Sequence, residues 1–270
     1  MLYWILKRVV LGPIVMLLFR PRVEGAHHVP AEGPAILASN HLSFSDSIFL
    51  PAVLDRRITF PAKIEYFTQS GVVGYFKKLF MKGTGQIPID RSGGSAAASA
   101  IDAGLTVLAE GGLFGIYPEG TRSPDGRLYK GKTGAVRMAL VAGCPIIPVA
   151  MIDTEKAQPT GQKIPKIIRV GVRFGEPIDF SAYAGLEDDR RALRAMTDEV
   201  MYSLMRLSGQ EYVDEYAAGR KLALAAKAQE AAALAQGAAT KAQDAWVSAR
   251  NRRIGRDVAE SETGETGTGA

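Results

Sequence analysis

The chain has 270 residues, of which 47% are hydrophobic and 8% aromatic, a composition that supports a globular core and excludes a wholly disordered protein. Its formal net charge of +5 favours anionic partners, which include nucleic acid, acidic carrier proteins, coenzyme phosphates and anionic lipid. The single cysteine, Cys144, excludes an internal disulfide and a multi-cysteine zinc site, and its place beside an apolar run favours a buried filler over a nucleophile.

The first 24 residues predict a helix that lies in a membrane interface. Residues 1–19 are mostly apolar, but their uninterrupted apolar run, 9–19, is shorter than the roughly 20 residues that span a bilayer. An interfacial helix would place its aromatic and basic side chains at the lipid headgroups. These side chains are Tyr3, Trp4, Lys7, Arg8, Arg20 and Arg22. A helix packed against the protein core is the alternative.

An apolar run at 35–38 predicts a strand, followed by a tight turn and a helix that Ser43 or Ser45 caps. His41 and Asp46 lie in this turn, where open α/β sheets place their active sites. Asp46 can orient the imidazole of His41 and stabilise its protonated form. The same residues also fit an ordinary helix start, in which His41 is a cap and Asp46 is a first-turn carboxylate favoured by the helix dipole.

Strands and helices alternate after this turn. Residues 58–60 predict a short strand that leads to Lys63. Residues 71–81 predict a helix with an apolar face and a basic edge, which suits either a membrane surface or solvent. A strand at 85–91 ends in an Asp-Arg pair, and a helix follows at 96–110.

A strand at 113–117 runs directly into residues 118–126, which are too rich in charge and glycine for a simple connector. Helical character follows at 130–143. The continuous apolar run at 146–152 predicts a central buried strand, in which Pro148 requires a bulge or an edge position.

A later strand at 167–174 and a charged helix at 187–207 complete the pattern. This alternation predicts the α/β fold class, with a single domain over residues 25–210 whose mostly parallel central sheet is flanked by helices. An alanine-rich helical extension is expected over 211–250 and a disordered polar tail over 251–270.

Residues 126–133 fit the phosphate-cradling pattern of four residues between glycines followed by Lys-Thr. Such a loop needs a strand that ends immediately before the first glycine, whereas the preceding strand ends near Tyr117. A P-loop NTPase that uses residues 126–133 is therefore a disfavoured alternative.

Four blocks occur in order: Asn-His-Leu-Ser-Phe-Ser-Asp at 40–46, Gly-Gln-Ile-Pro-Ile-Asp-Arg at 85–91, Tyr-Pro-Glu-Gly-Thr-Arg-Ser at 117–123 and Ile-Pro-Val at 147–149. With these blocks the chain resembles the glycerolipid acyltransferases with a His-x4-Asp motif, and most of all the 1-acyl-sn-glycerol-3-phosphate acyltransferases. The chain departs from this family's usual pattern where Pro88 replaces a frequent aromatic residue and Tyr117 a frequent phenylalanine.

The resemblance implies an O-acyltransferase of phospholipid biosynthesis. It would move a fatty acyl group from acyl-CoA or acyl carrier protein to the free hydroxyl of 1-acyl-glycerol-3-phosphate, which gives phosphatidic acid. Glycerol-3-phosphate, a lyso-ornithine lipid or a glycolipid are alternative acceptors in the same superfamily. A purely membrane-binding or nucleic-acid-binding protein is the alternative of another class, and we expect no nucleic-acid partner.

The resemblance also implies residue roles. His41 would be the general base and Asp46 its orienting carboxylate. The acceptor would be bound by Glu119, Gly120, Thr121 and Arg122, with Arg91 and Lys63 as further cations. A salt bridge from Arg122 to Asp125 or Glu119 is the structural alternative. No metal or cofactor is expected. We expect contact with an anionic membrane surface, as a monotopic or peripheral protein at the cytoplasmic face of the plasma membrane.

Overall fold

The computed structural model describes residues 2–90, 96–162 and 164–264. Those up to Ala218 form one compact unit, and those from Gly219 onward form a second. Within the described part of the first unit, a seven-stranded sheet has the order β1-β8-β7-β2-β5-β3-β4, and β6 pairs with β9 in a separate small sheet. The strands are β1 (Arg22–Glu24), β2 (Ala35–Ser39), β3 (Ile58–Lys63), β4 (Gln86–Ile89), β5 (Leu113–Ile116), β6 (Leu128–Tyr129), β7 (Ile146–Ile152), β8 (Gly171–Phe174) and β9 (Tyr212–Val213).

Five neighbouring strands, β7, β2, β5, β3 and β4, run parallel, whereas β8 is antiparallel to β7 and β1 is parallel to β8. The predicted α/β fold with a mostly parallel sheet is therefore confirmed. Because parallel strands share one direction, the carboxyl ends of β7, β2, β5 and β3 meet at the same edge of the sheet.

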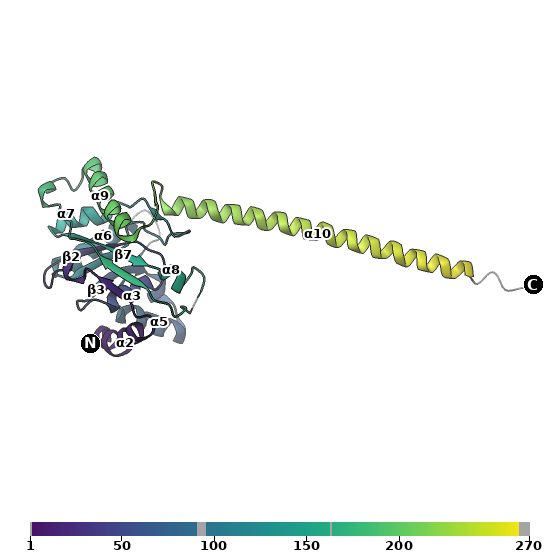
Figure 1. Cartoon of the computed structure of the whole chain (residues 1–270), viewed down its shortest axis with the longest axis horizontal. Helices are drawn as coiled ribbons and strands as arrows, with labels where there is room; N and C mark the ends of the chain where they lie inside the picture. Colours follow the sequence, from purple (N-terminus) through teal and green to yellow (C-terminus); the bar gives the residue numbers. More distant parts are fainter. Residues whose placement is uncertain (1, 91–95, 163, 265–270) are drawn as a thin grey trace, which may run out of the picture. The chain divides into compact units, whose positions relative to one another are not determined.

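Helices cover both faces of the sheet (Figure 1). The helical segments are α1 (Leu2–Ile5), η1 (Leu6–Leu11), α2 (Gly12–Leu18), η2 (Ala26–His28), α3 (Asp46–Ala52), α4 (Glu65–Thr68), α5 (Gly71–Gly83), α6 (Ala96–Ala109), α7 (Gly134–Ala142), α8 (Thr154–Ala157), η3 (Ser181–Tyr183), α9 (Arg190–Ser208) and α10 (Ala217–Gly264). Helices α6, α7 and α9 pack on the face that includes Ile36 and Ala38. Helices α2 and α3 pack on the face of Ala35 and Leu37. The whole of β2 is buried for this reason, and residues 35–38 of the strand form a continuous apolar run.

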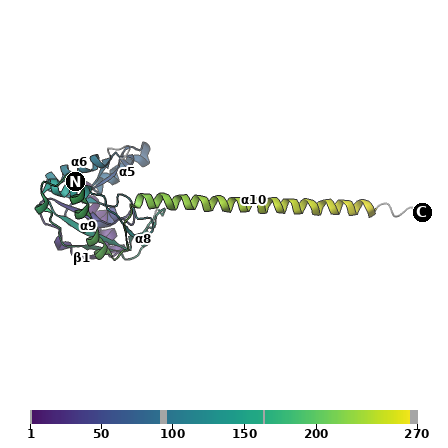
Figure 2. The ribbon, with the colours of Figure 1, turned by 90° about the horizontal axis from the view of Figure 1, so that it is seen from above.

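The second view separates the two edges of the sheet (Figure 2): α5 and α6 lie towards one side of the molecule, and β1 and α8 towards the other. This matches the strand order, since α5 and α6 both contact β4 at one end of the sheet, and β1 forms the other end.

The N-terminal helical segment is docked on the domain through two of the side chains that we expected at lipid headgroups. Tyr3 is only 5% exposed, and its hydroxyl accepts a hydrogen bond from the backbone of Ile58. The ammonium of Lys7 donates to the carbonyl oxygens of Asp55 and Arg56, and burial lowers the pKa of Lys7 to about 8. The predicted lipid contact is therefore wrong for Tyr3 and Lys7, because the polar atoms of both are used within the protein.

The opposite side of this segment is apolar and exposed, with Leu17 70% exposed. Among the described residues, no helix combines the length and the apolar character that crossing a bilayer requires.

Pro148 lies inside the sheet, since β7 pairs with β2 on one side and β8 on the other. The predicted edge position is wrong, but a bulge is present across from it. Ile146 is bridged to Ile178, and Val149 pairs with Phe174, so the segment facing Pro148 holds one residue more than β7 does. The extra residue accommodates the position at which proline has no N–H to donate.

The alanine-rich helix α10 begins at Ala217 and continues to Gly264. Our prediction of disorder from residue 251 is therefore wrong for residues 251–264, which continue the helix, and residues 265–270 lie outside the described part of the chain. Residues 250–260 contain four arginines, which are good helix formers, and no proline interrupts the chain between 251 and 264.

Candidate active site

The site forms where the parallel strands end. His41 follows β2, Tyr117 follows β5, and Lys63 is the last residue of the neighbouring β3. The order β7-β2-β5-β3 places these strand ends side by side, so residues distant in sequence converge at one edge.

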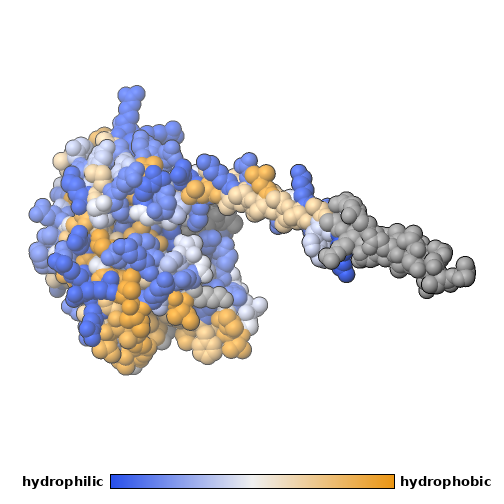
Figure 3. All heavy atoms as spheres, turned by 45° about the vertical axis from the view of Figure 1, so that its right-hand side comes forward, coloured by the Kyte–Doolittle hydropathy of each residue, from blue (hydrophilic) through white to orange (hydrophobic). Residues whose placement is uncertain are grey.

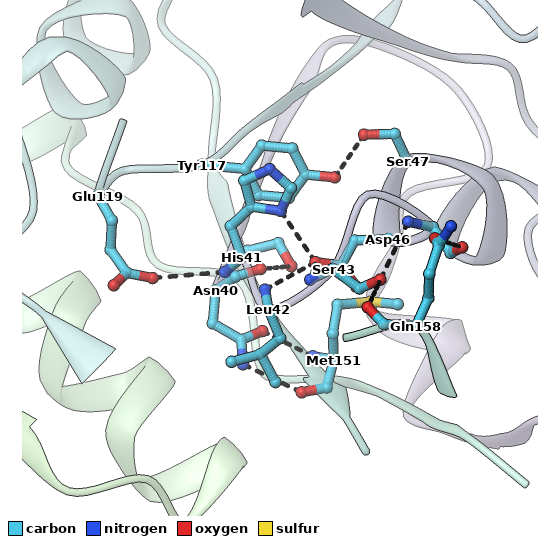
Figure 4. Close-up of polar contacts among 12 residues, drawn as sticks. Asn40, His41, Leu42, Ser43, Asp46, Ser47, Tyr117, Glu119, Met151 and Gln158 are labelled. Carbon is cyan, nitrogen blue, oxygen red and sulfur yellow. Dashed lines mark hydrogen bonds and ion pairs between the residues drawn. The ribbon is translucent and has the colours of Figure 1, made fainter. Parts of the chain in front are cut away.

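His41 and Asp46 form a close pair in the turn between β2 and α3 (Figure 4). Nδ1 of His41 lies 2.9 Å from Oδ2 of Asp46. The same oxygen accepts the backbone N–H groups of Leu42 and Ser43, each at 2.8 Å. The Asp46 side chain is fully buried, whereas that of His41 is 17% exposed. The carboxylate therefore holds the Nδ1 edge of the imidazole and leaves Nε2 to act on a substrate.

Buried amide and hydroxyl groups hold this turn in place. Asn40 donates to and accepts from the backbone of Met151 on β7. The hydroxyl of Ser43 donates to the carbonyl of Gln158, and that of Ser45 donates to the Gln158 side chain. Ser45 is the residue before α3, but its side chain does not cap the helix. The predicted serine cap is wrong, because Ser45 makes no capping bond and the Ser43 hydroxyl accepts the N–H of Ser45, which precedes the helix.

The ring of Tyr117 lies against the imidazole of His41 (Figure 4). The ring centroids are 3.8 Å apart and the planes differ by only 10°. The Tyr117 hydroxyl is hydrogen-bonded to Ser47 at 2.8 Å, and burial raises the pKa of this phenol well above its usual value. The side chain that replaces the family's usual phenylalanine therefore packs on the imidazole and is tethered beside Asp46.

Glu119 is placed behind His41 rather than towards a substrate. Its side chain is buried, and its two carboxylate oxygens accept the backbone N–H groups of His41 at 3.4 Å and Tyr129 at 2.9 Å. Burial raises the pKa of Glu119 to about 8. The expected contact of Glu119 with the acceptor does not fit this placement, because its oxygens join two backbone segments.

The rest of the 118–126 loop is attached directly to the backbone of His41. The N–H of Ser123 donates to the carbonyl of His41 at 2.8 Å. Gly120 has a φ of 72°, a left-handed conformation that glycine adopts without strain, and its N–H closes a turn onto the Tyr117 carbonyl. Thr121 is part of the same turn and is half-buried.

Arg122 is half-buried and forms no hydrogen bond or ion pair with any residue that the structure describes. The alternative salt bridge is not present, since Asp125 binds Arg127 and Tyr129 while Glu119 binds backbone. Arg122 thus presents an uncompensated guanidinium one residue from the bond that joins this loop to His41. A planar guanidinium grips phosphate oxygens in a bidentate manner.

The structure says less about the two further cations expected to bind the acceptor, Lys63 and Arg91. Lys63 is exposed at the end of β3, at the edge of the sheet where His41 lies. Arg91 lies outside the described residues. No group of three His, Cys, Asp or Glu side chains in the described ranges is arranged to hold a metal ion.

The P-loop alternative is wrong. Residues 126–133 contain the buried strand β6, whose Leu128 and Tyr129 belong to the core, and α7 begins only at Gly134. Strand β5 ends at Ile116, so no strand leads into Gly126 as a phosphate-cradling loop requires.

No sequence motif identified Gln210, which links the turn after β2 to the 118–126 loop. Its side chain accepts from Asn40 at 2.7 Å and donates to the carbonyl of Gly126 at 2.6 Å. It lies between α9 and β9, outside every motif block, so no local pattern could have marked it.

The chain is similar to known proteins over the region that contains this site. Residues 20–152 match the protein-family model described as Acyltransferase. The chain is 28% identical over 190 residues to the 1-acyl-sn-glycerol-3-phosphate acyltransferase of Bacillus subtilis, covering 70% of this chain and 88% of that protein. It is 30% identical over 146 residues to the chloroplastic 1-acyl-sn-glycerol-3-phosphate acyltransferase LPAT1 of Arabidopsis thaliana, covering 54% of this chain and 39% of that protein.

The chain thus spans well under half the length of the plant relative. A solved structure, the 1-acyl-sn-glycerophosphate (LPA) acyltransferase PlsC from Thermotoga maritima, is similar with a TM-score of 0.54 at 22% identity, covering 73% of this chain and 78% of that one. That similarity supports the fold. Residues 20–152, which carry His41, Asp46 and Arg122, belong to the acyltransferase family.

Proposed function

We propose that this protein transfers a fatty acyl group from an acyl thioester to the free hydroxyl of 1-acyl-glycerol-3-phosphate, which gives phosphatidic acid. The observation that carries the proposal is the pairing of His41 with buried Asp46, next to a loop that presents Arg122 and is hydrogen-bonded to the His41 backbone. The names of the plant and bacterial relatives give the same acceptor class. The donor is acyl-CoA or acyl carrier protein.

The chemistry follows from the two nitrogens of His41. Because Nδ1 faces Asp46, Nε2 takes the proton of the acceptor hydroxyl as its oxygen attacks the thioester carbonyl. Asp46 stabilises the imidazolium that forms. The tetrahedral intermediate then expels the thiolate, which takes the proton back from Nε2. The products are the ester and the free thiol, so His41 ends in its starting state.

Arg122 orients the acceptor in this scheme. Its guanidinium binds the phosphate, and the bonds between the loop and His41 set the distance from that phosphate to the base. The phosphate is therefore the anchor, and the glycerol hydroxyl is the reacting end.

The test is an assay of phosphatidic acid formation from lysophosphatidate with radiolabelled acyl-CoA and with acyl carrier protein. His41→Ala is expected to lower kcat about a hundredfold to ten-thousandfold. Arg122→Ala is expected to raise the KM for lysophosphatidate about tenfold to a hundredfold, since a charge-assisted bond to phosphate is lost.

A folded His41→Ala variant that keeps wild-type activity would exclude this mechanism. Circular dichroism spectra of both variants establish that they are folded. A panel with glycerol-3-phosphate, a lyso-ornithine lipid and a glycolipid distinguishes the proposed acceptor from the alternatives.

We further propose that the protein works on an anionic bilayer, as a monotopic or peripheral protein at the cytoplasmic leaflet, where its thioester donors are found. Hydrophobic side chains gather along the lower side of the molecule in Figure 3, where Figure 1 places α2 and α5. They include Leu17 on α2 and Val72 on α5, which are 70% and 73% exposed, and α1 contacts α5. Two apolar helices on one side of a domain fit an interface into which both insert their side chains.

Sedimentation with phosphatidylglycerol vesicles tests this contact. Leu17→Glu and Val72→Glu should each reduce binding, whereas Leu222→Glu, at an exposed apolar position on α10, is the matched control. Equal binding by all three variants would contradict the proposed surface.

A further inference from the structure

The 118–126 loop, which we call the acceptor loop, and the segment that follows it up to residue 132 contain two classes of basic residue: those paired with a carboxylate and those that are not. There are four between residues 118 and 132: Arg122, Arg127, Lys130 and Lys132. Arg127 pairs with Asp125 at 2.7 Å, and Lys130 pairs with Asp214 at 2.8 Å. Arg122 and Lys132 have no ion pair with any described residue. Two of the four charges are thus neutralised within the protein, and two are left for a ligand.

The side chain of Lys132 lies across the glycine of the acceptor loop. A Cβ placed on Gly120 would be 3.0 Å from Cε and 3.1 Å from Nζ of Lys132. Glycine at this position therefore leaves room for the lysine as well as permitting the left-handed turn. The backbone N–H of Lys132 donates to the carbonyl of Pro118 at 2.8 Å, which fixes the segment against the loop.

The two carboxyl groups of the 118–126 loop, Glu119 and Asp125, are both engaged by other groups. Glu119, between Pro118 and Gly120, has both oxygens engaged by backbone N–H groups, and burial raises its pKa to about 8, so it is mostly neutral at pH 7. Asp125 is held by Arg127 and Tyr129. A phosphate monoester carries roughly 1.5 to 2 negative charges at neutral pH, which two cations balance.

We propose that Lys132 is a second cation of the acceptor site, which together with Arg122 selects an acceptor bearing a dianionic phosphate monoester. The inference rests on the proposed function, because it assigns a further binding residue to the same reaction. Arg122 supplies a planar bidentate contact, and Lys132 supplies a compact point charge beside Gly120. Lys132 is also the lysine of the P-loop pattern at 126–133. In this proposal it binds phosphate together with the 118–126 loop and not as part of a P-loop.

Lys132→Met tests the proposal, because it removes the charge and keeps most of the side-chain length. The full chain is assayed with lysophosphatidate in mixed detergent micelles and with a saturating acyl thioester. We expect the KM for lysophosphatidate to rise about tenfold to a hundredfold, with kcat and the KM for the donor within about twofold of wild type. Lys132→Arg should recover most of the acceptor affinity, since it restores the charge.

Lys130→Met is the matched control, since it removes the same charge from the same segment but from a lysine paired with Asp214. Its KM for lysophosphatidate should stay within about twofold of wild type. An unchanged KM in Lys132→Met, or an equal rise in both variants, would overturn the role of Lys132 while leaving the proposed reaction intact. Absence of acyl transfer to lysophosphatidate by the wild-type protein would instead overturn the proposed function itself.

Discussion

Replacing Asp46 with asparagine separates the charge of the carboxylate from its geometry. All three hydrogen bonds that Asp46 receives converge on Oδ2, and two of them come from the backbone N–H groups of Leu42 and Ser43. These donors require an acceptor, so the amide oxygen of Asp46→Asn should occupy the Oδ2 position. His41 then keeps its orientation and its Nδ1–H tautomer, and only the negative charge is lost.

The expected loss follows from the distance. The imidazole is neutral before proton transfer and cationic after it, so Asp46 stabilises the transition state more than the ground state. Two unit charges about 4 Å apart attract by about 4 kcal/mol at an effective dielectric constant of about 20. Because the His41 side chain is 17% exposed, solvent screens part of this attraction. A remaining effect of about 3 kcal/mol lowers kcat/KM by about a hundredfold.

The assay measures kcat/KM for phosphatidic acid formation alongside the free energy of unfolding. A moderate loss of stability, about 1 to 3 kcal/mol, is also expected, because the amide NH2 would occupy the place of Oδ1, a buried atom with no hydrogen-bond partner among the described residues. Asp153→Asn, which removes a carboxylate from the exposed pair with Lys156, serves as the control. A folded Asp46→Asn variant with kcat/KM within threefold of the wild-type value would refute the electrostatic role.

Three further substitutions test the surroundings of the base. Tyr117→Phe keeps the stacked ring but loses the bond to Ser47, so kcat should fall by less than about tenfold, whereas Tyr117→Leu should cost more in the same assay. Glu119 has a folded pKa of about 8, above its ordinary value of 4.5, so its stabilising contribution is complete below about pH 4.5 and is lost as the pH rises through about 8. The difference in urea-unfolding free energy between wild type and Glu119→Gln should shrink over that range, and a constant difference would contradict the burial argument. Gln210→Leu should lower both the melting temperature and kcat, with Gln210→Glu restoring neither, because the bond to Gly126 needs a donor.

The surroundings of His41 could be predicted because local pattern and packing agree there. Strand β2 is buried on both faces and begins with a continuous apolar run at 35–38, so its end, and hence the turn, can be located from sequence. The five-residue separation of His41 and Asp46 allows their side chains to meet within that turn, as they do. The prediction of an α/β sheet rests on the same kind of signal, repeated along the chain.

Whether a motif side chain faces a substrate or the protein depends on tertiary contacts that no local pattern contains. Glu119 and Arg122 stand three residues apart in one block, yet one is 1% exposed and bonded to the backbone, and the other is unpaired among the described residues. The difference arises because β6 brings the N–H of Tyr129 next to Glu119. The role of Gln210 depends likewise on β9, which follows it and pairs with β6.

The distribution of charge in the site explains how the base, His41, and the phosphate-binding cation, Arg122, can work next to each other. The loop of Arg122 is attached to the His41 backbone by neutral hydrogen bonds and not by an ion pair, so the attachment uses up no positive charge. The negative charge of Asp46 lies behind the imidazole, buried against the start of α3. Glu119, which belongs to this loop, is kept mostly protonated at neutral pH by burial. An ionised Glu119 would attract Arg122 and weaken its grip on phosphate, so the burial that makes this carboxyl group costly to ionise also preserves the cationic character of the acceptor site.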